Sequence, residues 1–369
     1  MIIVLVFFAL YAVMLALFAL KLMSANNRKD AGALRENEYT ILIAARNEEA
    51  NIEKCIEALL NQTLKPFAII VVDDNSEDKT SEILANISKK NSIVKHVVCK
   101  ENVVGKSKAL QEALKFVETE IILTIDADCF PTERWAESLI YKLKNKKLVT
   151  GPVIVAPSKN FRKNIESAET LFLIGFGAGA ASFGLMFEAS GANMAFYKTD
   201  FESFYNTNAA GKYKSGDDVY FLQYIQKKHG LKSAFFASDS LSVVETGACE
   251  SFSSWIKQRV RWASKAPGYF SILPFVFGGI VALINVLFLL TIIYVIINGF
   301  DLFSIGVLCL KIFSELLLLV SCSQSWKIKA KVFYFLFLPV FYPFFLLSVG
   351  ISLLLFKNRL KWKGRPCVK

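Results

Sequence analysis

Long apolar runs mark both ends of this 369-residue chain. Residues 1–20 contain no charged or amide side chain. Three further apolar runs follow near the C-terminus, at residues 272–297, 302–320 and 332–356. About 20 apolar residues suffice to cross the roughly 30 Å hydrocarbon core of a bilayer as a helix. The pattern therefore predicts a transmembrane helix at residues 1–22 and a transmembrane region at 269–356 with about three helices.

Between residues 38 and 250, short β-rich runs alternate with amphipathic helical runs. This alternation is typical of an α/β domain with a mostly parallel sheet and helices on both faces. The expected strands are residues 40–45, 68–72, 94–98, 121–125 and 148–155. The expected helices between them are residues 49–61, 77–89 and 106–117. In such sheets, ligands bind beyond the C-terminal ends of the strands.

A fifth apolar stretch, residues 171–187, is rich in glycine and alanine. If it crossed the membrane, the polar clusters on either side of it would lie in different compartments. We therefore expect a packed or interfacial helix within the α/β domain at this position.

Charges beside the first apolar run indicate an orientation. Lys21, Arg28 and Lys29 follow that run, and the positive-inside rule then places residues 38–250 in the cytoplasm. The sequence thus predicts a multi-pass protein of the plasma (inner) membrane with a cytoplasmic α/β domain.

The basic tail at residues 357–369 conflicts with this orientation. It carries six cations and no acid, yet four spans would place it outside. Three explanations stay open: the rule is broken, one run is interfacial, or Pro339 and Pro343 break the last run into a re-entrant hairpin.

Composition and charge exclude other classes of protein. Only 20% of residues are charged and 54% are hydrophobic, whereas soluble proteins are about one quarter charged. The net charge is +11, but residues 252–369 hold 14 Lys/Arg and 2 Asp/Glu, so that segment carries +12 and the rest −1. These cations flank apolar runs, which favours anionic lipid and not nucleic acid as their partner. Seven scattered cysteines and two histidines give no Cys/His metal site.

Polar clusters follow the first two predicted strands. The first cluster contains Arg46, Asn47, Glu48 and Glu49, and the second contains Asp73, Asp74, Asn75 and Ser76. Acidic and amide groups at neighbouring strand ends suit the hydrogen-bonding edge of a base and a ribose. Alternatively, Asp74, Asn75 or Ser76 caps the following helix.

Two later clusters suit a diphosphate. Gly105 and Lys106 stand at a predicted helix start, where free N–H groups and a cation favour phosphate. Asp126 and Asp128 follow the fourth predicted strand, and side chains two residues apart in an extended segment point the same way. Paired carboxylates with substrate phosphates suit Mg²⁺ or Mn²⁺, although an isolated DxD is also found in surface loops.

The last two clusters precede the C-terminal apolar runs. Gly216, Asp217 and Asp218 begin an amphipathic run, where the carboxylates alternatively serve as helix caps. Residues 251–268 contain Gln258, Arg261 and Trp262 on a basic amphipathic stretch, for which an interfacial helix is the simpler interpretation.

In this order the clusters resemble the membrane-bound members of glycosyltransferase family 2. These are inverting enzymes with the GT-A (nucleotide-diphospho-sugar transferase, Rossmann-like) fold, and they include cellulose, chitin and hyaluronan synthases and ceramide glucosyltransferase. The resemblance runs from about Tyr39 to Trp262. Its matching pieces are RNEE, VVDDNS, GKSKAL, DAD, SGAN at residues 190–193, GDD and QRVRW.

The resemblance implies a role for each position. The donor nucleotide would be held by Ala45, Arg46, Glu48, Asp73, Asp74, Lys106 and Asp126. The metal ligands would be Asp126 and Asp128, the latter the more direct. Asp218 matches the catalytic base, with Asp217 in place of the more usual glutamate before it. Gln258, Arg261 and Trp262 match the QxxRW motif, which serves the donor pyrophosphate and the acceptor.

We therefore expect an inverting, metal-dependent glycosyltransferase that moves a sugar from a nucleotide donor, a UDP-sugar first among them, to a membrane lipid. A processive polysaccharide synthase is the alternative, because relatives of that kind also carry QxxRW. Rivals from other classes are a transporter, suggested by Lys311 and Glu315 within an apolar run, and a catalytically silent nucleotide-binding scaffold.

Overall fold

The computed structural model describes residues 1–24, 38–100, 105–207, 217–265, 269–356, 361–362 and 365–366. The chain divides into two compact units. We call Met1–Asn26, Ile154–Phe187 and Ala248–Lys357 the helical unit. We call Asn27–Val153, Glu188–Gly247 and Asn358–Lys369 the sheet unit.

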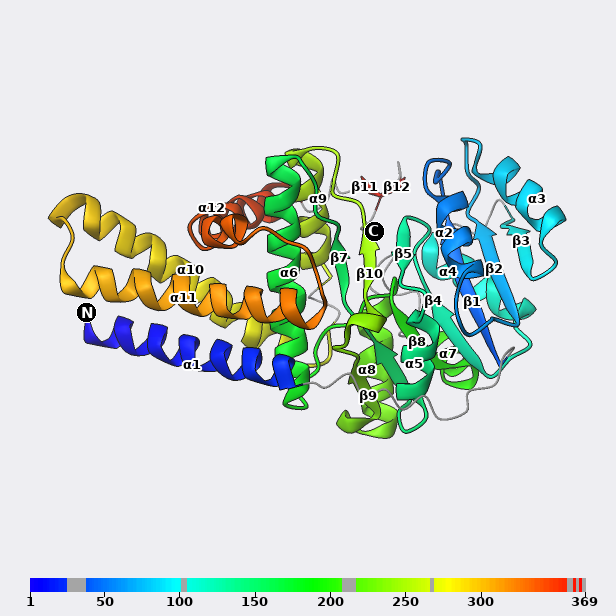
Figure 1. Ribbon diagram of the computed structural model, residues 1–369, viewed down its shortest axis with the longest axis horizontal. Coiled ribbons are helices and arrows are strands. Elements are labelled where there is room, and N and C mark those ends of the chain that lie inside the picture. Colours follow the sequence, from blue (N-terminus) through cyan, green and yellow to red (C-terminus); the bar gives the residue numbers. More distant parts are fainter. Residues whose placement is uncertain are drawn as a thin grey trace. The chain divides into compact units, whose positions relative to one another are not determined.

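Seven strands build the main sheet of the sheet unit (Figure 1): β1 (Tyr39–Ala45), β2 (Ala68–Asp73), β3 (Val94–Val98), β4 (Ile121–Thr124), β6 (Leu148–Thr150), β8 (Met194–Tyr197) and β9 (Ala234–Phe236). Their order is β3-β2-β1-β4-β8-β6-β9. β1 pairs in parallel with β2 and β4, β2 with β3, and β6 with β9, whereas β8 is antiparallel to both neighbours. The predicted α/β class with a mostly parallel sheet is confirmed.

One predicted strand, residues 148–155, is two strands in the structure. β6 ends at Thr150, and β7 (Val153–Val155) belongs to a three-stranded sheet with β5 (Cys129–Pro131) and β10 (Val244–Thr246). Pro152 lacks the N–H that a central strand needs. Gly151 lies so close to the Asn193 side chain and the Ser242 carbonyl that a Cβ would approach them to 2.7 and 2.8 Å.

Helices cover both faces of the main sheet because strand side chains alternate between faces. On one face, Ile41, Ile43 and Ile69 share a buried core with residues of the helices α2 and α5. On the other face, α4 packs against β1 and β2. The helices of this unit are α2 (Ile52–Leu60), α3 (Thr80–Lys90), α4 (Lys106–Ala113), α5 (Trp135–Leu143), α7 (Lys198–Tyr205) and α8 (Asp217–His229). Short elements are the 3₁₀ turns Leu114–Phe116, Leu231–Ser233 and Ser240–Ser242 and the strands β11 (Lys361–Trp362) and β12 (Arg365–Pro366).

The helical unit contains six helices among the described residues: α1 (Ile2–Ser24), α6 (Phe161–Ser182), α9 (Phe252–Ala263), α10 (Leu273–Asn298), α11 (Leu302–Ser325) and α12 (Val332–Phe356). α1 and α11 lie side by side (Figure 1). By length and composition α1, α10, α11 and α12 are candidate membrane spans, as predicted. α12 is continuous through Pro339 and Pro343, so the re-entrant hairpin is wrong. Most of the basic tail lies outside the described residues.

Residues 171–182 of the glycine-rich stretch belong to α6, which is not among the candidate spans. α6 packs against α1, α11 and α12. It is thus a packed helix, as expected, but it belongs to the helical unit, so its expected place within the α/β domain is wrong. A Cβ at Gly179 would lie 2.5 Å from Cβ of Phe18 on α1, and a Cβ at Gly175 would overlap the Cys322 sulfur on α11. The small residues therefore permit close helix packing, the role that such residues have between membrane helices.

A buried ion pair joins residues of α11, as their spacing predicts. Lys311 Nζ donates to Glu315 Oε1 at 2.6 Å, and both side chains are at most 1% exposed. The hydroxyl of Tyr11 on α1 donates to the same Glu315 oxygen at 3.1 Å. The cluster therefore ties α1 to α11 through polar groups that water cannot reach.

Replacing Lys311 with alanine is expected to destabilise the protein by about 3–5 kcal/mol, because Glu315 would remain buried without its cation. The double variant Lys311→Met/Glu315→Met removes both charges and is expected to cost much less. Thermal unfolding of the purified protein in detergent measures both. Equal losses in the two variants would show that the pair is not charge-coupled.

Candidate functional site

The turns that follow β1 and β2 hold each other in place. Arg46 donates from Nη1 to the backbone carbonyl of Asp74 at 2.9 Å and from Nη2 to the Glu77 carboxylate at 2.7 Å. The Asn47 side chain accepts a hydrogen bond from the Glu77 N–H at 2.8 Å. Asn47 and Asn75 have φ angles of 52° and 54°, a left-handed conformation that asparagine tolerates better than most residues. Arg46 thus serves to join the two turns.

Asp73 and Asp74 are both 1% exposed but have different partners. Asp73 Oδ1 accepts a hydrogen bond from the Ser76 N–H at 2.9 Å and another from the Ser76 hydroxyl, so this carboxylate closes the turn. Asp74 Oδ2 accepts from the N–H of Gly105 at 3.0 Å, just before α4. The helix α3 has Lys79 as its N-cap residue, so the capping alternative for Asp74, Asn75 and Ser76 is wrong.

Two other predicted residues, Ala45 and Glu48, make backbone hydrogen bonds at these strand ends, and the Glu48 carboxylate also accepts from the Asn51 side-chain amide at 3.3 Å. The Ala45 carbonyl accepts from the Asp74 N–H at 2.8 Å. The Glu48 N–H donates to the Thr80 hydroxyl at 2.8 Å, and the Glu48 carbonyl accepts from the first N–H of α2, that of Ile52, at 2.9 Å. The strand-end residues therefore form one hydrogen-bonded edge beside the start of α4.

Lys106 begins α4 and forms an ion pair with the Asp126 carboxylate. Burial lowers the pKa of the Lys106 ammonium, but the charges of Asp126 and Asp218 outweigh it and hold the pKa above its ordinary value. Lys106 is therefore a cation at neutral pH. Its side chain is 33% exposed, so the residue lies partly open to solvent.

Gly191 brings Lys106 and Asp218 to one point. A Cβ on Gly191 would lie 3.4 Å from Lys106 Nζ and 3.7 Å from Asp218 Cβ. The Gly191 N–H donates to Asp218 Oδ2 at 3.3 Å, and Asp218 Oδ1 accepts from the Val219 N–H at 2.9 Å. The carboxylate thus has a fixed orientation in the first turn of α8. A cation and two carboxylates, of Asp126 and Asp218, converge here from three separate segments.

Asp126 and Asp128 lie in the connection between β4 and β5. The Cys129 thiol lies 3.7 Å from Asp128 Oδ1, and the Cys55 thiol lies 3.7 Å from the Asp126 carbonyl. Burial, together with the charges of Asp128 and Asp126, raises the pKa of both thiols, which therefore stay protonated. No group of three or more His, Cys, Asp or Glu side chains among the described residues forms a metal cage. Two carboxylates fit Mg²⁺ or Mn²⁺ when substrate and water supply the remaining oxygen ligands.

The SGAN segment at residues 190–193 has a structural role that its sequence pattern does not indicate. Asn193 is fully buried, accepts from the Trp135 indole N–H at 2.8 Å and donates to the carbonyls of Pro152 and Ser242 at 2.9 and 2.8 Å. It therefore fixes the loop in which Gly191 contacts Asp218. The sequence signal for Asn193 is the match of residues 190–193 to the SGAN motif, which by itself gives the residue no role.

Glu188 lies just before this loop. Its Oε1 is buried and has no hydrogen-bond partner among the residues that the structure describes. Burial raises the pKa of the carboxyl to about 8.

Replacing Glu188 with glutamine is expected to stabilise the protein at alkaline pH. The folded-state pKa lies above the unfolded value, so the stability of the wild type falls as the pH rises between about 4.5 and 8. Glutamine removes this loss, so Tm should rise by roughly 3 °C or more at pH 8.5 and change little at pH 5. Thermal unfolding at both pH values measures the difference, and a pH-independent effect would contradict it.

The remaining predicted residues lie in the helical unit or outside the described side chains. Gln258, Arg261 and Trp262 share a face of α9, where residues three and four apart are neighbours. The buried side of α9 carries Trp255, whose ring stacks on Phe345 of α12 at a centroid distance of 4.2 Å. α9 is thus packed against α12 as well as amphipathic. The side chain of Asp217 lies outside the described residues.

Known proteins share sequence or fold with this chain. The family model of glycosyl transferase family 2 matches residues 40–204. A 4,4'-diaponeurosporenoate glycosyltransferase of Staphylococcus haemolyticus is 27% identical over 166 residues, 44% of each chain. A beta-monoglucosyldiacylglycerol synthase of Trichormus variabilis is 39% identical over 92 residues, 24% of this chain and 20% of that one. The matches therefore span less than half the length of these relatives.

A solved structure extends the likeness to the fold. The mannosyltransferase of Pyrobaculum calidifontis, solved with GDP-Man and Mn²⁺, has a TM-score of 0.53 over 95% of this chain and 99% of that chain, at 16% identity. At this identity the match concerns the fold. Residues 40–204 of this chain are therefore a glycosyl transferase family 2 domain with the GT-A fold.

Proposed function

We propose that this protein is an inverting glycosyltransferase that transfers a sugar from a nucleotide-diphosphate sugar to a membrane lipid at the cytoplasmic face of the membrane. The observation that carries the proposal is the convergence of Lys106, Asp126 and Asp218 around Gly191. This arrangement holds a cation for a leaving diphosphate near a fixed carboxylate for an incoming hydroxyl.

The donor would bind along the edge formed by the turns after β1 and β2 and by the start of α4. Cleavage of the bond between sugar and diphosphate develops negative charge on the leaving group, which preorganised cations stabilise. Lys106 supplies one such cation. Asp126 and Asp128 would hold Mg²⁺ or Mn²⁺, which when bound neutralises further diphosphate charge.

Asp218 would act as the general base. Its carboxylate, oriented by the N–H groups of Gly191 and Val219, would accept the proton of the acceptor hydroxyl as that oxygen attacks the anomeric carbon. With one carboxylate acting as base and none as nucleophile, the reaction would be a single displacement that inverts the configuration at the anomeric carbon. We further propose that Gln258, Arg261 and Trp262 of α9 serve the pyrophosphate and the acceptor.

A lipid acceptor is supported by the four candidate spans and by the name of a relative, beta-monoglucosyldiacylglycerol synthase. The second candidate is a polysaccharide synthase. It is supported by the 27% identity over 158 residues to poly-beta-1,6-N-acetyl-D-glucosamine synthase of Staphylococcus aureus, a match that spans 37% of that protein.

Membranes containing the protein should be incubated with a panel of labelled nucleotide sugars, UDP-sugars first, and the products identified by mass spectrometry. A single glycolipid product supports the lipid acceptor. A ladder of oligomers supports the polysaccharide synthase instead. Absence of transfer from every donor, with purified protein that still binds a nucleotide sugar, would favour a catalytically silent scaffold.

A further inference from the structure

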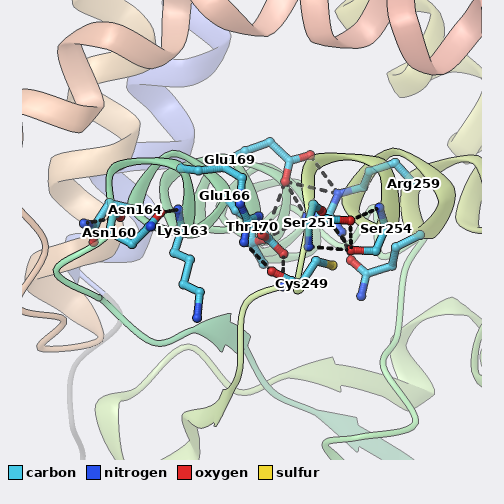
Figure 2. A network of polar contacts seen from close by, with 12 residues as sticks. Asn160, Lys163, Asn164, Glu166, Glu169, Thr170, Cys249, Ser251, Ser254 and Arg259 are labelled. Atoms are coloured by element: carbon cyan, nitrogen blue, oxygen red, sulfur yellow. Dashed lines mark hydrogen bonds and ion pairs between the residues drawn. The ribbon is translucent and has the colours of Figure 1, made fainter.

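Arg259 is a buried arginine that joins α9 to α6 within the helical unit. Its side chain is 6% exposed, and that of its partner Glu169 on α6 is 1% exposed. Arg259 Nε donates to both Glu169 oxygens, at 2.8 and 3.1 Å, and Nη2 donates to the Thr170 hydroxyl at 2.8 Å. Figure 2 shows the two side chains facing each other from neighbouring helices.

The same guanidinium contacts two of the three QxxRW residues. Its Nη1 donates to the side-chain carbonyl of Gln258. Its central carbon lies 4.2 Å from the centroid of the Trp262 ring, a cation–π arrangement. Arg259 occupies the first of the two positions that the QxxRW pattern leaves unspecified, yet it contacts the first and last residues of the motif.

Only arginine can make these contacts together. A guanidinium is planar, carries five N–H donors in a fixed fork and stacks on aromatic rings. A lysine ammonium keeps the charge but presents a single nitrogen, so it could satisfy Glu169 while releasing Gln258 and Trp262. A lysine at position 259 would therefore keep the charge but lose the contacts that orient Gln258 and Trp262.

α9 has a second, independent attachment. Trp255, one helical turn before Arg259, stacks on Phe345 and Phe341 of α12 at centroid distances of 4.2 and 5.9 Å. A change at Arg259 that keeps the charge should thus disturb the rotamers of Gln258 and Trp262 more than the position of the helix.

We propose that Arg259, clamped by Glu169 and Thr170, is a positioning residue that fixes the side chains of Gln258 and Trp262 for sugar transfer. This proposal rests on the proposed function, in which Gln258 and Trp262 serve the pyrophosphate and the acceptor. Arg259 acts through these two residues, and its own charge is compensated by Glu169.

A matched control lies in the same network. Arg162 on α6 donates to Glu166 at 2.8 Å and to the carbonyl of Cys249. Glu166 also accepts from the Cys249 N–H at 2.8 Å, which places this second arginine–carboxylate pair beside the first. No contact of Arg162 with Gln258, Arg261 or Trp262 occurs among the described interactions, so Arg162→Lys perturbs the network without touching the motif.

Arg259→Lys is expected to lower kcat for sugar transfer by about 10- to 100-fold, because the groups that position the substrate would be misplaced. The KM for the donor should stay within about threefold of wild type. Arg162→Lys should keep kcat within about twofold of wild type. Steady-state kinetics of the purified proteins, with their Tm values, measure both. Equal effects of the two variants on kcat, or an unchanged kcat in Arg259→Lys, would overturn the proposal.

A double-mutant cycle tests whether Arg259 acts through Trp262. The kcat of the double variant Arg259→Lys/Trp262→Leu should lie within about threefold of the kcat of the slower single variant. The effects of residues that act as a unit on kcat are not additive. Multiplied losses would overturn the positioning role. A wild type that transfers no sugar would overturn the proposed function instead, so the two failures are distinguishable.

Discussion

Replacing Asp218 with asparagine is expected to lower kcat for sugar transfer by about 10²- to 10⁴-fold, the usual contribution of a positioned general base. Asparagine keeps the shape and can still accept a hydrogen bond from the Gly191 N–H, so the loop and α8 should stay in place. It cannot take up the proton of an acceptor hydroxyl. Turnover of the identified donor, with donor affinity measured by calorimetry, separates lost chemistry from lost binding.

Asp200→Asn is the matched control for this change. Asp200 on α7 accepts hydrogen bonds from Lys228 Nζ at 2.9 Å and from His229 Nε2 at 2.8 Å, near the C-terminal end of α8. Its loss should lower Tm but leave kcat close to wild type. Full activity of Asp218→Asn, or an equal loss of kcat in Asp200→Asn, would remove Asp218 from the role of base.

The first half of the sheet could be predicted from the sequence because its information is local. β1, β2, β3 and β4 are short apolar runs that end in polar turns, and parallel pairing brings the C-terminal ends of β1, β2 and β4 to one edge. Residues that follow a strand in the sequence, such as Asp74 and Asp126, therefore lie near the start of α4 in the folded domain.

The rest depends on contacts between distant residues. The predicted strand 148–155 divides because Gly151 must pass close to Asn193 and Ser242, a constraint that hydropathy does not record. The packing of α6 likewise depends on Gly175 and Gly179 meeting side chains of other helices. The sequence also gives no reason to single out Arg259, since its partners Glu169 and Thr170 lie about 90 residues away.

The two aspartates of the predicted metal motif, Asp126 and Asp128, differ in their charged partners. Lys106 pairs with Asp126, and the Asp218 carboxylate also lies close enough beside Gly191 to interact with the Lys106 charge. Since part of the charge of Asp126 already compensates Lys106, Asp128 is the carboxylate on which a divalent ion would depend most. The ion pair between Lys106 and Asp126 is therefore a physical reason to expect Asp128 to be the more direct metal ligand of the two.

Chelation of divalent metal is therefore expected to abolish transfer, with Mn²⁺ or Mg²⁺ restoring it, whereas Asp128→Asn should lower kcat/KM by about 10²-fold or more even at saturating metal. Paramagnetic resonance of added Mn²⁺ in the presence of nucleotide diphosphate reports binding without turnover.

Asp239→Asn is the control, because Asp239 pairs with Lys142 at 2.6 Å and caps a 3₁₀ turn through the Leu241 N–H. It should keep wild-type Mn²⁺ binding. Wild-type turnover in excess chelator, or normal Mn²⁺ binding by Asp128→Asn, would contradict the metal role of Asp128.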